Sequence, residues 1–364
     1  MYLKMENFVV SARKYRPETW ESVVGQQGIT NTLKNAIEQN HLGQAFLFCG
    51  PRGVGKTTTA RILAKTVNLK DLNGEKPQDK NFSFNIFELD AASNNTVEDI
   101  RNLIDQVRIP PQTGNYKIYI IDEVHMLSSA AFNAFLKTLE EPPKHAIFIL
   151  ATTEKHKIIP TIISRCQVFD FKRIQVKDMV AHLNHVAQSE KIEAEEDALH
   201  VIAQKADGGM RDALSIFDRM VSFSGSSITY KDVVENLNIL DFDYYFKATE
   251  LILAGDIPGL LILFDEVLNN GFDGSTFING LASHFRDLLT ALNPQTLHLI
   301  EAGDTIKEKY TEQSAKCDKL LLTAGLKLCT ECDYKYRTAK NKRLLVELTL
   351  MQLASLKFND EKKN

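Results

Sequence analysis

The chain of 364 residues lacks long hydrophobic runs and contains few cysteines. No stretch reaches the roughly 18 consecutive apolar residues that a membrane-spanning helix needs. Charged residues such as Lys4, Glu6 and Arg13 interrupt the N-terminal region, which excludes the apolar core of a signal peptide. We therefore expect a cytoplasmic protein that makes no membrane contact.

The five cysteines are too few and too scattered for a disulfide framework, and they fit reduced thiols. Cys329 and Cys332 form a CxxC pair, but no second pair that could complete a zinc site lies nearby. Because the flanking sequence has a helical pattern, we interpret these two cysteines as ordinary helix residues.

An excess of basic residues is also missing, since the formal net charge is −4. A free-standing nucleic-acid binder usually carries a basic surface. Any contact with DNA must therefore come from local geometry or from several subunits together. The length suggests two to three domains.

Short apolar runs alternate with helical patterns over about the first 172 residues. The runs are rich in β-branched and aromatic residues, and each is short enough to be a buried strand. Strands alternating with helices predict a parallel sheet that is covered on both faces. The predicted strands are residues 45–49, 85–89, 117–121, 146–151 and 167–171.

The strand pattern ends after about Lys172. Residues 176–237 predict three helices, separated at Gly208-Gly209 and at the stretch 222–227. Residues 239–364 predict helices throughout. We therefore divide the chain into domains at 1–174, 175–238 and 239–364.

A phosphate-binding pattern, G-x-x-x-x-G-K-[ST], follows the first predicted strand and precedes a helix. Glycines let backbone N–H groups face phosphate oxygens, and the helix N-terminus adds positive charge. We expect Lys56 to reach the β- and γ-phosphates and Thr57 to bind Mg²⁺. The alternative, a structural glycine-rich turn, explains less of the pattern. The predicted nucleotide-binding residues here are Gly50, Pro51, Arg52, Gly53, Val54, Gly55, Lys56, Thr57 and Thr58.

Two acids, Asp122 and Glu123, end the predicted strand at 117–121. We expect Asp122 to hold Mg²⁺ through its water shell and Glu123 to orient or deprotonate the attacking water. Such a pair alone is more often a helix cap or an exposed turn, but the upstream phosphate loop favours a catalytic role. The predicted cofactors are therefore ATP and Mg²⁺.

These motifs together resemble the clamp-loader ATPases of the AAA+ class, in detail the gamma/tau family of bacterial DNA polymerase III. The resemblance implies a P-loop AAA+ domain with a parallel sheet, a small helical lid domain and an all-helical collar domain. It also implies an ATP-driven motor that loads the sliding clamp onto primed DNA during replication. The segments that carry it are RKYRP at 13–17, VVGQ at 23–26, AASN at 91–94, DEVHML at 122–127, FNAFLKTLEEPP at 132–143 and LATT at 150–153.

The resemblance also implies roles for individual residues. Thr153 corresponds to the position that senses the γ-phosphate, and Arg211 to the arginine that bridges the lid to the nucleotide. Arg165, in the motif SRC, corresponds to the arginine that completes the ATP site of a neighbouring subunit. The stretch from Arg13 to Val24 resembles the segment that packs around the adenine.

From the residues alone, other interpretations stay open for the two arginines. Arg165 would form a surface salt bridge, and Arg211 would pair loosely with Asp207 or Asp212 on an exposed helix. A guanidinium group is nevertheless suited to phosphate oxygens, because its charge is permanent and its donors have a fixed geometry.

The implied partners are the delta and delta-prime subunits of the loader, further copies of this chain, the sliding clamp and primed DNA. A capping box at Thr96 and Asp99 opens a helix whose N-terminus, by the same resemblance, would approach the DNA backbone, although for any single residue a capped surface helix is the favoured interpretation. No DNA ligand is assigned.

The chain departs from the family in two respects. Residues 69–81, where a four-cysteine zinc module would stand, contain no cysteine or histidine, so we predict a short polar loop and no zinc. The chain also ends at Asn364, so the activities of the longer tau form do not carry over.

Two rival functions remain at this point. A non-hydrolysing structural subunit would lack Lys56 or Glu123, and both are present. A Holliday-junction branch-migration ATPase would carry a C-terminal winged-helix domain, whereas residues 239–364 predict helices.

Overall fold

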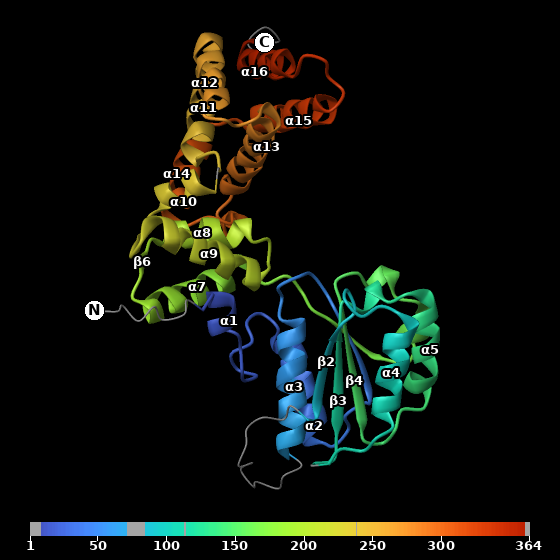
Figure 1. Cartoon of the computed structure of the whole chain (residues 1–364). Helices are drawn as coiled ribbons and strands as arrows, with labels where there is room; N and C mark the ends of the chain where they lie inside the picture. Colours follow the sequence, from blue (N-terminus) through green and yellow to red (C-terminus); the bar gives the residue numbers. More distant parts are fainter. Residues whose placement is uncertain (1–8, 71–83, 113, 238, 361–364) are drawn as a thin grey trace, which may run out of the picture. The chain divides into compact units, whose positions relative to one another are not determined.

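The computed structural model describes residues 9–70, 84–112, 114–237 and 239–360 (Figure 1). The chain forms two compact units, the first made of residues 1–190 and 203–219 and the second of residues 191–202 and 220–364. Within the described ranges, every helix is too short or too polar to cross a membrane.

The first unit contains a five-stranded parallel sheet with the order β2-β3-β4-β1-β5. The predicted positions of all five strands are confirmed to within one or two residues. The predicted α/β unit with a parallel sheet is therefore confirmed. The strands are β1 (Ala45–Cys49), β2 (Ile86–Asp90), β3 (Lys117–Asp122), β4 (Ala146–Thr152) and β5 (Gln167–Asp170).

Alternate residues of β1 enter different cores, as the period of two in a strand requires. Phe46 and Phe48 pack with Leu63 of α3 on one side of the sheet. Leu47 packs with Phe135 of α5 on the other side. Figure 1 shows α2 and α3 on one face and α4 and α5 on the opposite face. These helices are α2 (Gln27–Glu38), α3 (Lys56–Lys70), α4 (Val97–Val107) and α5 (Ser129–Glu140).

The strand order places β1 between β4 and β5, away from β2, its successor in the chain. The order in which strands are added to the sheet thus reverses beside β1. Ligands of such sheets bind at the carboxyl ends of the strands near this point. Cys49, at the end of β1, is the register partner of Thr152, at the end of β4. The residues that follow β1, β3 and β4 therefore meet at one edge of the sheet.

Short elements complete this part of the first unit. They are α1 (Ser11–Lys14), η1 (Val124–Met126), η2 (Lys155–Lys157) and α6 (Pro160–Ile163). The loop predicted at 69–81 begins at the end of α3, and residues 71–81 lie outside the described ranges.

The region predicted to hold three helices, 176–237, contains four and a pair of two-residue strands. The prediction missed the break at residues 191–195, which separates α7 from α8. The third predicted helix, after residue 227, corresponds to α10. It begins at a capping box, in which Thr229 Oγ1 accepts from Asp232 N at 3.2 Å and Asp232 Oδ2 accepts from Thr229 N at 3.3 Å. The elements are α7 (Val176–Glu190), β6 (Glu193–Ala194), α8 (Glu196–Lys205), α9 (Met210–Ser224), β7 (Ser227–Ile228) and α10 (Tyr230–Asn236). The domain boundaries at 174 and 238 remain predictions.

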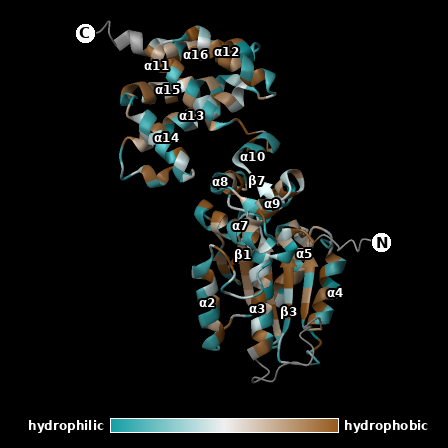
Figure 2. Cartoon of the chain, turned by 90° about the vertical axis from the view of Figure 1, so that its left-hand side faces the viewer, coloured by the Kyte–Doolittle hydropathy of each residue, from teal (hydrophilic) through white to brown (hydrophobic). Residues whose placement is uncertain are grey.

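Residues after 239 are helical over the described range, as predicted. Their core is continuous and includes Phe264, Phe277 and Phe285, with Cys329 and Cys332 buried in α15 as ordinary helix residues. Figure 2 shows that hydrophobic residues of these helices alternate with hydrophilic ones, as amphipathic helices require. The helices are α11 (Phe242–Ala254), α12 (Ile257–Asn269), α13 (Gly274–Ala291), η3 (Leu297–Leu299), α14 (Asp304–Ser314), α15 (Lys319–Tyr336) and α16 (Lys342–Asp360).

Candidate functional site

The predicted phosphate loop connects the end of β1 to the start of α3 at Lys56. Gly50 has a φ of 148°, and a Cβ there would lie 2.5 Å from the carbonyl oxygen of Phe171. Gly53 has a φ of 76°, and a Cβ there would lie 3.3 Å from the Cβ of Arg211. Glycine is needed at both positions, because these backbone conformations and close approaches disfavour a side chain. The loop therefore has the compact path that a phosphate cradle requires.

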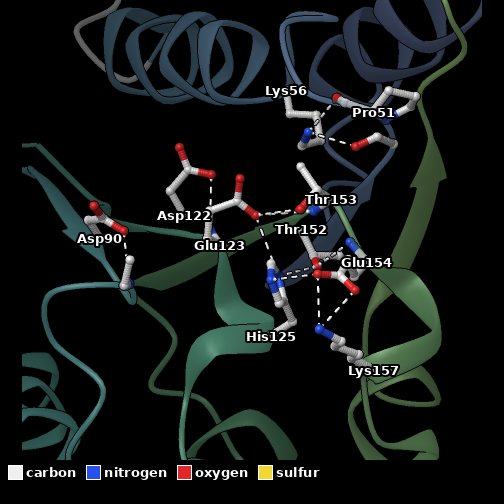
Figure 3. A network of polar contacts seen from close by, with 12 residues as sticks. Pro51, Lys56, Asp90, Asp122, Glu123, His125, Thr152, Thr153, Glu154 and Lys157 are labelled. Atoms are coloured by element: carbon white, nitrogen blue, oxygen red, sulfur yellow. Dashed lines mark hydrogen bonds and ion pairs between the residues drawn. The ribbon is translucent and has the colours of Figure 1, made fainter.

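Lys56, the first residue of α3, is 6% exposed, and its side chain turns back to the loop. Its Nζ donates hydrogen bonds to the carbonyl oxygens of Gly50 and Pro51, both at 2.7 Å (Figure 3). Burial lowers the pKa of Lys56, while the charges of Glu123 and Asp122 act to raise it. The ammonium group is thus oriented within the loop and faces the two acids.

Thr57 and Asp122 are in direct contact. The Thr57 hydroxyl group donates to Asp122 Oδ2 at 2.7 Å, and Asp122 Oδ1 accepts from the backbone N–H of Glu123 at 3.0 Å. The two motifs are 65 positions apart in the chain, so the fold alone brings these oxygens together. A hydroxyl and a carboxylate are the hard oxygen donors that suit Mg²⁺, and the pair fits an ion held partly through water.

Glu123 follows β3 in a left-handed conformation, with a φ of 47°. A non-glycine residue in this region is uncommon and is often found at functional sites. Its Oε2 accepts from Thr153 Oγ1 at 2.9 Å and from Thr153 N at 3.2 Å (Figure 3). The predicted water-orienting acid and the predicted γ-phosphate sensor therefore contact each other directly.

One pocket joins most of the predicted residues. Residues 52–58 of the phosphate loop line it together with Asp122, Glu123, Val24 and Arg211. Gly50 and Pro51 are absent from the lining and contribute their carbonyl groups to Lys56 instead. Arg13 is exposed on α1 and also lies outside the lining, so its predicted adenine contact has no support in this geometry.

Sequence reasoning missed several residues of the same pocket. Tyr15, Val23, Ile174 and Leu214 are among its lining residues and supply apolar surface of the kind that a nucleobase packs against. Tyr15 and Val23 lie in the stretch that was expected to pack around the adenine but were not singled out, whereas Ile174 and Leu214 come from separate segments of the first unit. Only the tertiary structure identifies them as a group.

Arg16 is the missed residue with the clearest chemistry. It lines the pocket, and burial lowers the pKa of its guanidinium group, with smaller contributions from the charges of Arg61 and Arg211. The acids Glu88 and Asp122 act in the opposite direction. Its position in the RKYRP segment could have suggested it, because that segment was already expected near the nucleotide.

Arg165 lies outside this pocket. It follows α6, and its Nη1 donates to the carbonyl oxygen of Thr161 at 2.7 Å. Its Nη2 forms an ion pair with Glu140 at the end of α5. The salt bridge that the residues alone suggested is therefore present, and a role in a neighbouring subunit stays a prediction.

Comparison with known proteins gives the family. A family model described as "DNA polymerase III clamp loader subunit, ATPase lid domain" matches residues 178–226, and one described as "DNA polymerase III, delta subunit" matches residues 25–175. The gamma subunit of DNA polymerase III from Buchnera aphidicola subsp. Baizongia pistaciae is 35% identical over 374 residues, which cover 96% of this chain and 98% of that protein.

The tau subunit from Bacillus subtilis is 40% identical over 350 residues, which cover 94% of this chain and 62% of that protein. This chain thus spans less than two-thirds of the length of that relative. Among solved structures, the RuvB Holliday junction branch migration motor of Thermotoga maritima has a TM-score of 0.49 at 22% identity, covering 65% of this chain and 79% of that one. At that score the structural similarity supports no statement about function. The sequence relationship is sufficient by itself, and this chain belongs to the gamma/tau family of DNA polymerase III clamp-loader subunits.

Proposed function

We propose that this chain is an ATP-hydrolysing motor subunit of the bacterial replicative clamp loader. The observation that carries the proposal is the contact between Thr57 and Asp122 at 2.7 Å, directly beside Lys56 and Glu123. Four side chains with separate tasks in phosphoryl transfer thereby share one pocket. A structural subunit without hydrolysis would have no use for this complete set.

Each group has a defined task when ATP and Mg²⁺ bind. Lys56 exchanges its two carbonyl partners for phosphate oxygens, which are stronger acceptors because they are charged. Thr57 and Asp122 hold the magnesium ion, whose chemistry is to neutralise charge on the phosphates. Glu123 orients a water molecule and accepts its proton as the oxygen attacks phosphorus.

Arginines supply the remaining positive charge. Arg211 and Arg16 line the same pocket and reach the nucleotide from within the chain. Arg165 is proposed to act on the nucleotide of a neighbouring copy, where its guanidinium group stabilises charge in the transition state. Assembly with other subunits is therefore part of the proposed catalytic cycle.

The proposed cycle converts nucleotide state into assembly state. ATP favours a form that grips the sliding clamp, and hydrolysis triggered by primed DNA favours release, so each ligand shifts a two-state equilibrium. The proposed partners are the delta and delta-prime subunits, further copies of this chain, the clamp and primed DNA, all in the cytoplasm.

The branch-migration alternative finds no support in the structure. Residues 239–360 form helices, and within that described range no strand of the kind a winged-helix domain contains is present. The non-hydrolysing alternative is disfavoured by the intact set of Lys56, Asp122 and Glu123.

The test is an ATPase assay of the chain alone and with the delta and delta-prime subunits, the clamp and primed DNA. We expect the complete mixture to hydrolyse ATP much faster than the chain alone, and Glu123→Gln to remove that increase while ATP still binds. Equal rates with and without clamp and DNA would refute the loader function. Hydrolysis by Glu123→Gln at the rate of the unchanged protein would refute the assigned chemistry.

A further inference from the structure

A histidine that lies outside the nucleotide pocket contacts the catalytic acid. His125 is in η1, two positions after Glu123, and its side chain is only 6% exposed. Its Nδ1 lies 3.4 Å from Glu123 Oε2 and 3.0 Å from Thr152 Oγ1 (Figure 3). The segment DEVHML contains this residue, but the sequence alone predicts no role for it.

The opposite side of the ring contacts a second acid. His125 Nε2 lies 3.4 Å from Glu154 Oε1, and Lys157 Nζ lies 2.9 Å from Glu154 Oε2. The hydrogen bond from Lys157 lowers the pKa of Glu154, which favours the carboxylate form. Each ring nitrogen thus lies close to a carboxylate oxygen, and Nδ1 is also within hydrogen-bond distance of Thr152 Oγ1.

The imidazole therefore lies between two carboxylates, and its hydrogen bond with Thr152 connects it to the end of β4. Thr152 is fully buried, and its Oγ1 also accepts from the backbone N–H of Glu154 at 3.0 Å. This leaves the ring little freedom to rotate. Its position is set by the sheet and not by the nucleotide.

All contacts of the Glu123 carboxylate within the described part of the chain fall on one oxygen. Oε2 accepts both hydrogen bonds from Thr153 and faces His125 Nδ1. The other oxygen, Oε1, is then the one available to a water molecule. A base that is fixed through one oxygen presents the other in a defined direction, which is what efficient proton transfer requires.

We propose that His125 is a positioning residue that fixes the Glu123 carboxylate against Thr153 through its Nδ1 atom. The proposal rests on the proposed function, because it gives Glu123 the task of activating water. His125 is not among the residues that line the nucleotide pocket, so the proposal makes it a positioning residue and not a catalytic one.

Side-chain replacements can test the role of Nδ1 separately from the role of Nε2. Asparagine places an amide nitrogen near the position of Nδ1, whereas glutamine places its amide near Nε2. The test variants are therefore His125→Asn, His125→Gln and His125→Ala. His156 provides a matched control, because it is exposed, also faces Glu154 at 3.5 Å, and makes no contact with Glu123.

The assay measures kcat and the dissociation constant of ATP in the complex with delta, delta-prime, clamp and primed DNA. We expect His125→Ala and His125→Gln to lower kcat by about tenfold to a hundredfold, a part of the 10²–10⁴ that a general base contributes. His125→Asn should recover most of that loss, His156→Ala should match the unchanged protein, and ATP affinity should stay within about twofold in all of them. A residue that only maintained the fold would not give this separation between asparagine and glutamine.

Three results would overturn the proposal. An unchanged kcat in His125→Ala would show that Glu123 needs no such support. Equal losses in the asparagine and glutamine variants would exclude a specific task for Nδ1, and a parallel loss of ATP affinity would point to general damage of the pocket. Glu123→Gln is measured alongside as a second variant. Normal hydrolysis by Glu123→Gln would reject the proposed function itself. If Glu123→Gln loses hydrolysis but His125→Ala stays fully active, only this inference is rejected.

Discussion

Replacing Thr57 by valine should weaken binding of ATP only when magnesium is present. The Thr57 hydroxyl donates to Asp122 Oδ2 at 2.7 Å, and valine keeps the shape of the side chain but removes this donor. A hydrogen bond to a charged group contributes about 1.5–3 kcal/mol. The same hydroxyl is proposed to hold the ion, so the loss should appear as a decrease of about tenfold to a hundredfold in affinity for Mg²⁺–ATP.

Isothermal titration calorimetry with Mg²⁺ and with a chelator separates binding through the metal ion from binding of the phosphates alone. Without the ion, the phosphates contact Lys56 and the loop amides, and we expect Thr57→Val to bind ATP as the unchanged protein does. Thr57→Ser retains the hydroxyl and is the matched control, with nearly normal affinity in both conditions. If Thr57→Val lost the same affinity with the chelator as with magnesium, the assignment of Thr57 to the metal would be wrong.

Four further predictions test other parts of the account. Arg165→Ala should bind ATP normally but lower hydrolysis in the assembled complex by about 10³–10⁵, and an equal loss in the isolated chain would exclude action on a neighbour. Gly50→Ala should reduce the free energy of unfolding in urea by about 1–3 kcal/mol, because a Cβ there would lie 2.5 Å from the Phe171 carbonyl oxygen; unchanged stability would contradict the described loop. Arg16→Met should weaken binding of ATP more than binding of AMP if its guanidinium group faces the phosphate tail, and equal weakening of both would place it elsewhere. Metal analysis of the purified protein should find no stoichiometric zinc, and one zinc per chain would overturn the interpretation of residues 69–81.

The parts of the fold that sequence predicted well are those determined by local pattern. The strand at 117–122 is short, contains three isoleucines and is buried at its first five positions, which is typical of a central strand. The phosphate loop is likewise encoded in eight consecutive residues, and its glycines adopt positive φ angles that other residues rarely adopt. The small strands β6 and β7 were missed because two residues carry no detectable period.

Contacts between distant segments could not be obtained in this way. The pairing of Arg165 with Glu140 depends on how α5 and the segment after α6 pack. The contacts of His125 with Glu123 and Glu154 depend on the register of β3 and β4 and on the turn at η1. Arg16 was part of a recognised segment, but only the folded pocket distinguishes it from Arg13.

The decisive measurement is a structure determined with Mg²⁺ and a non-hydrolysable ATP analogue. We expect the triphosphate to lie along residues 52–58, with Lys56 Nζ on phosphate oxygens and the ion beside Thr57 and Asp122. An analogue bound away from this loop, or an ion that contacts neither Thr57 nor Asp122 directly or through water, would contradict this expectation.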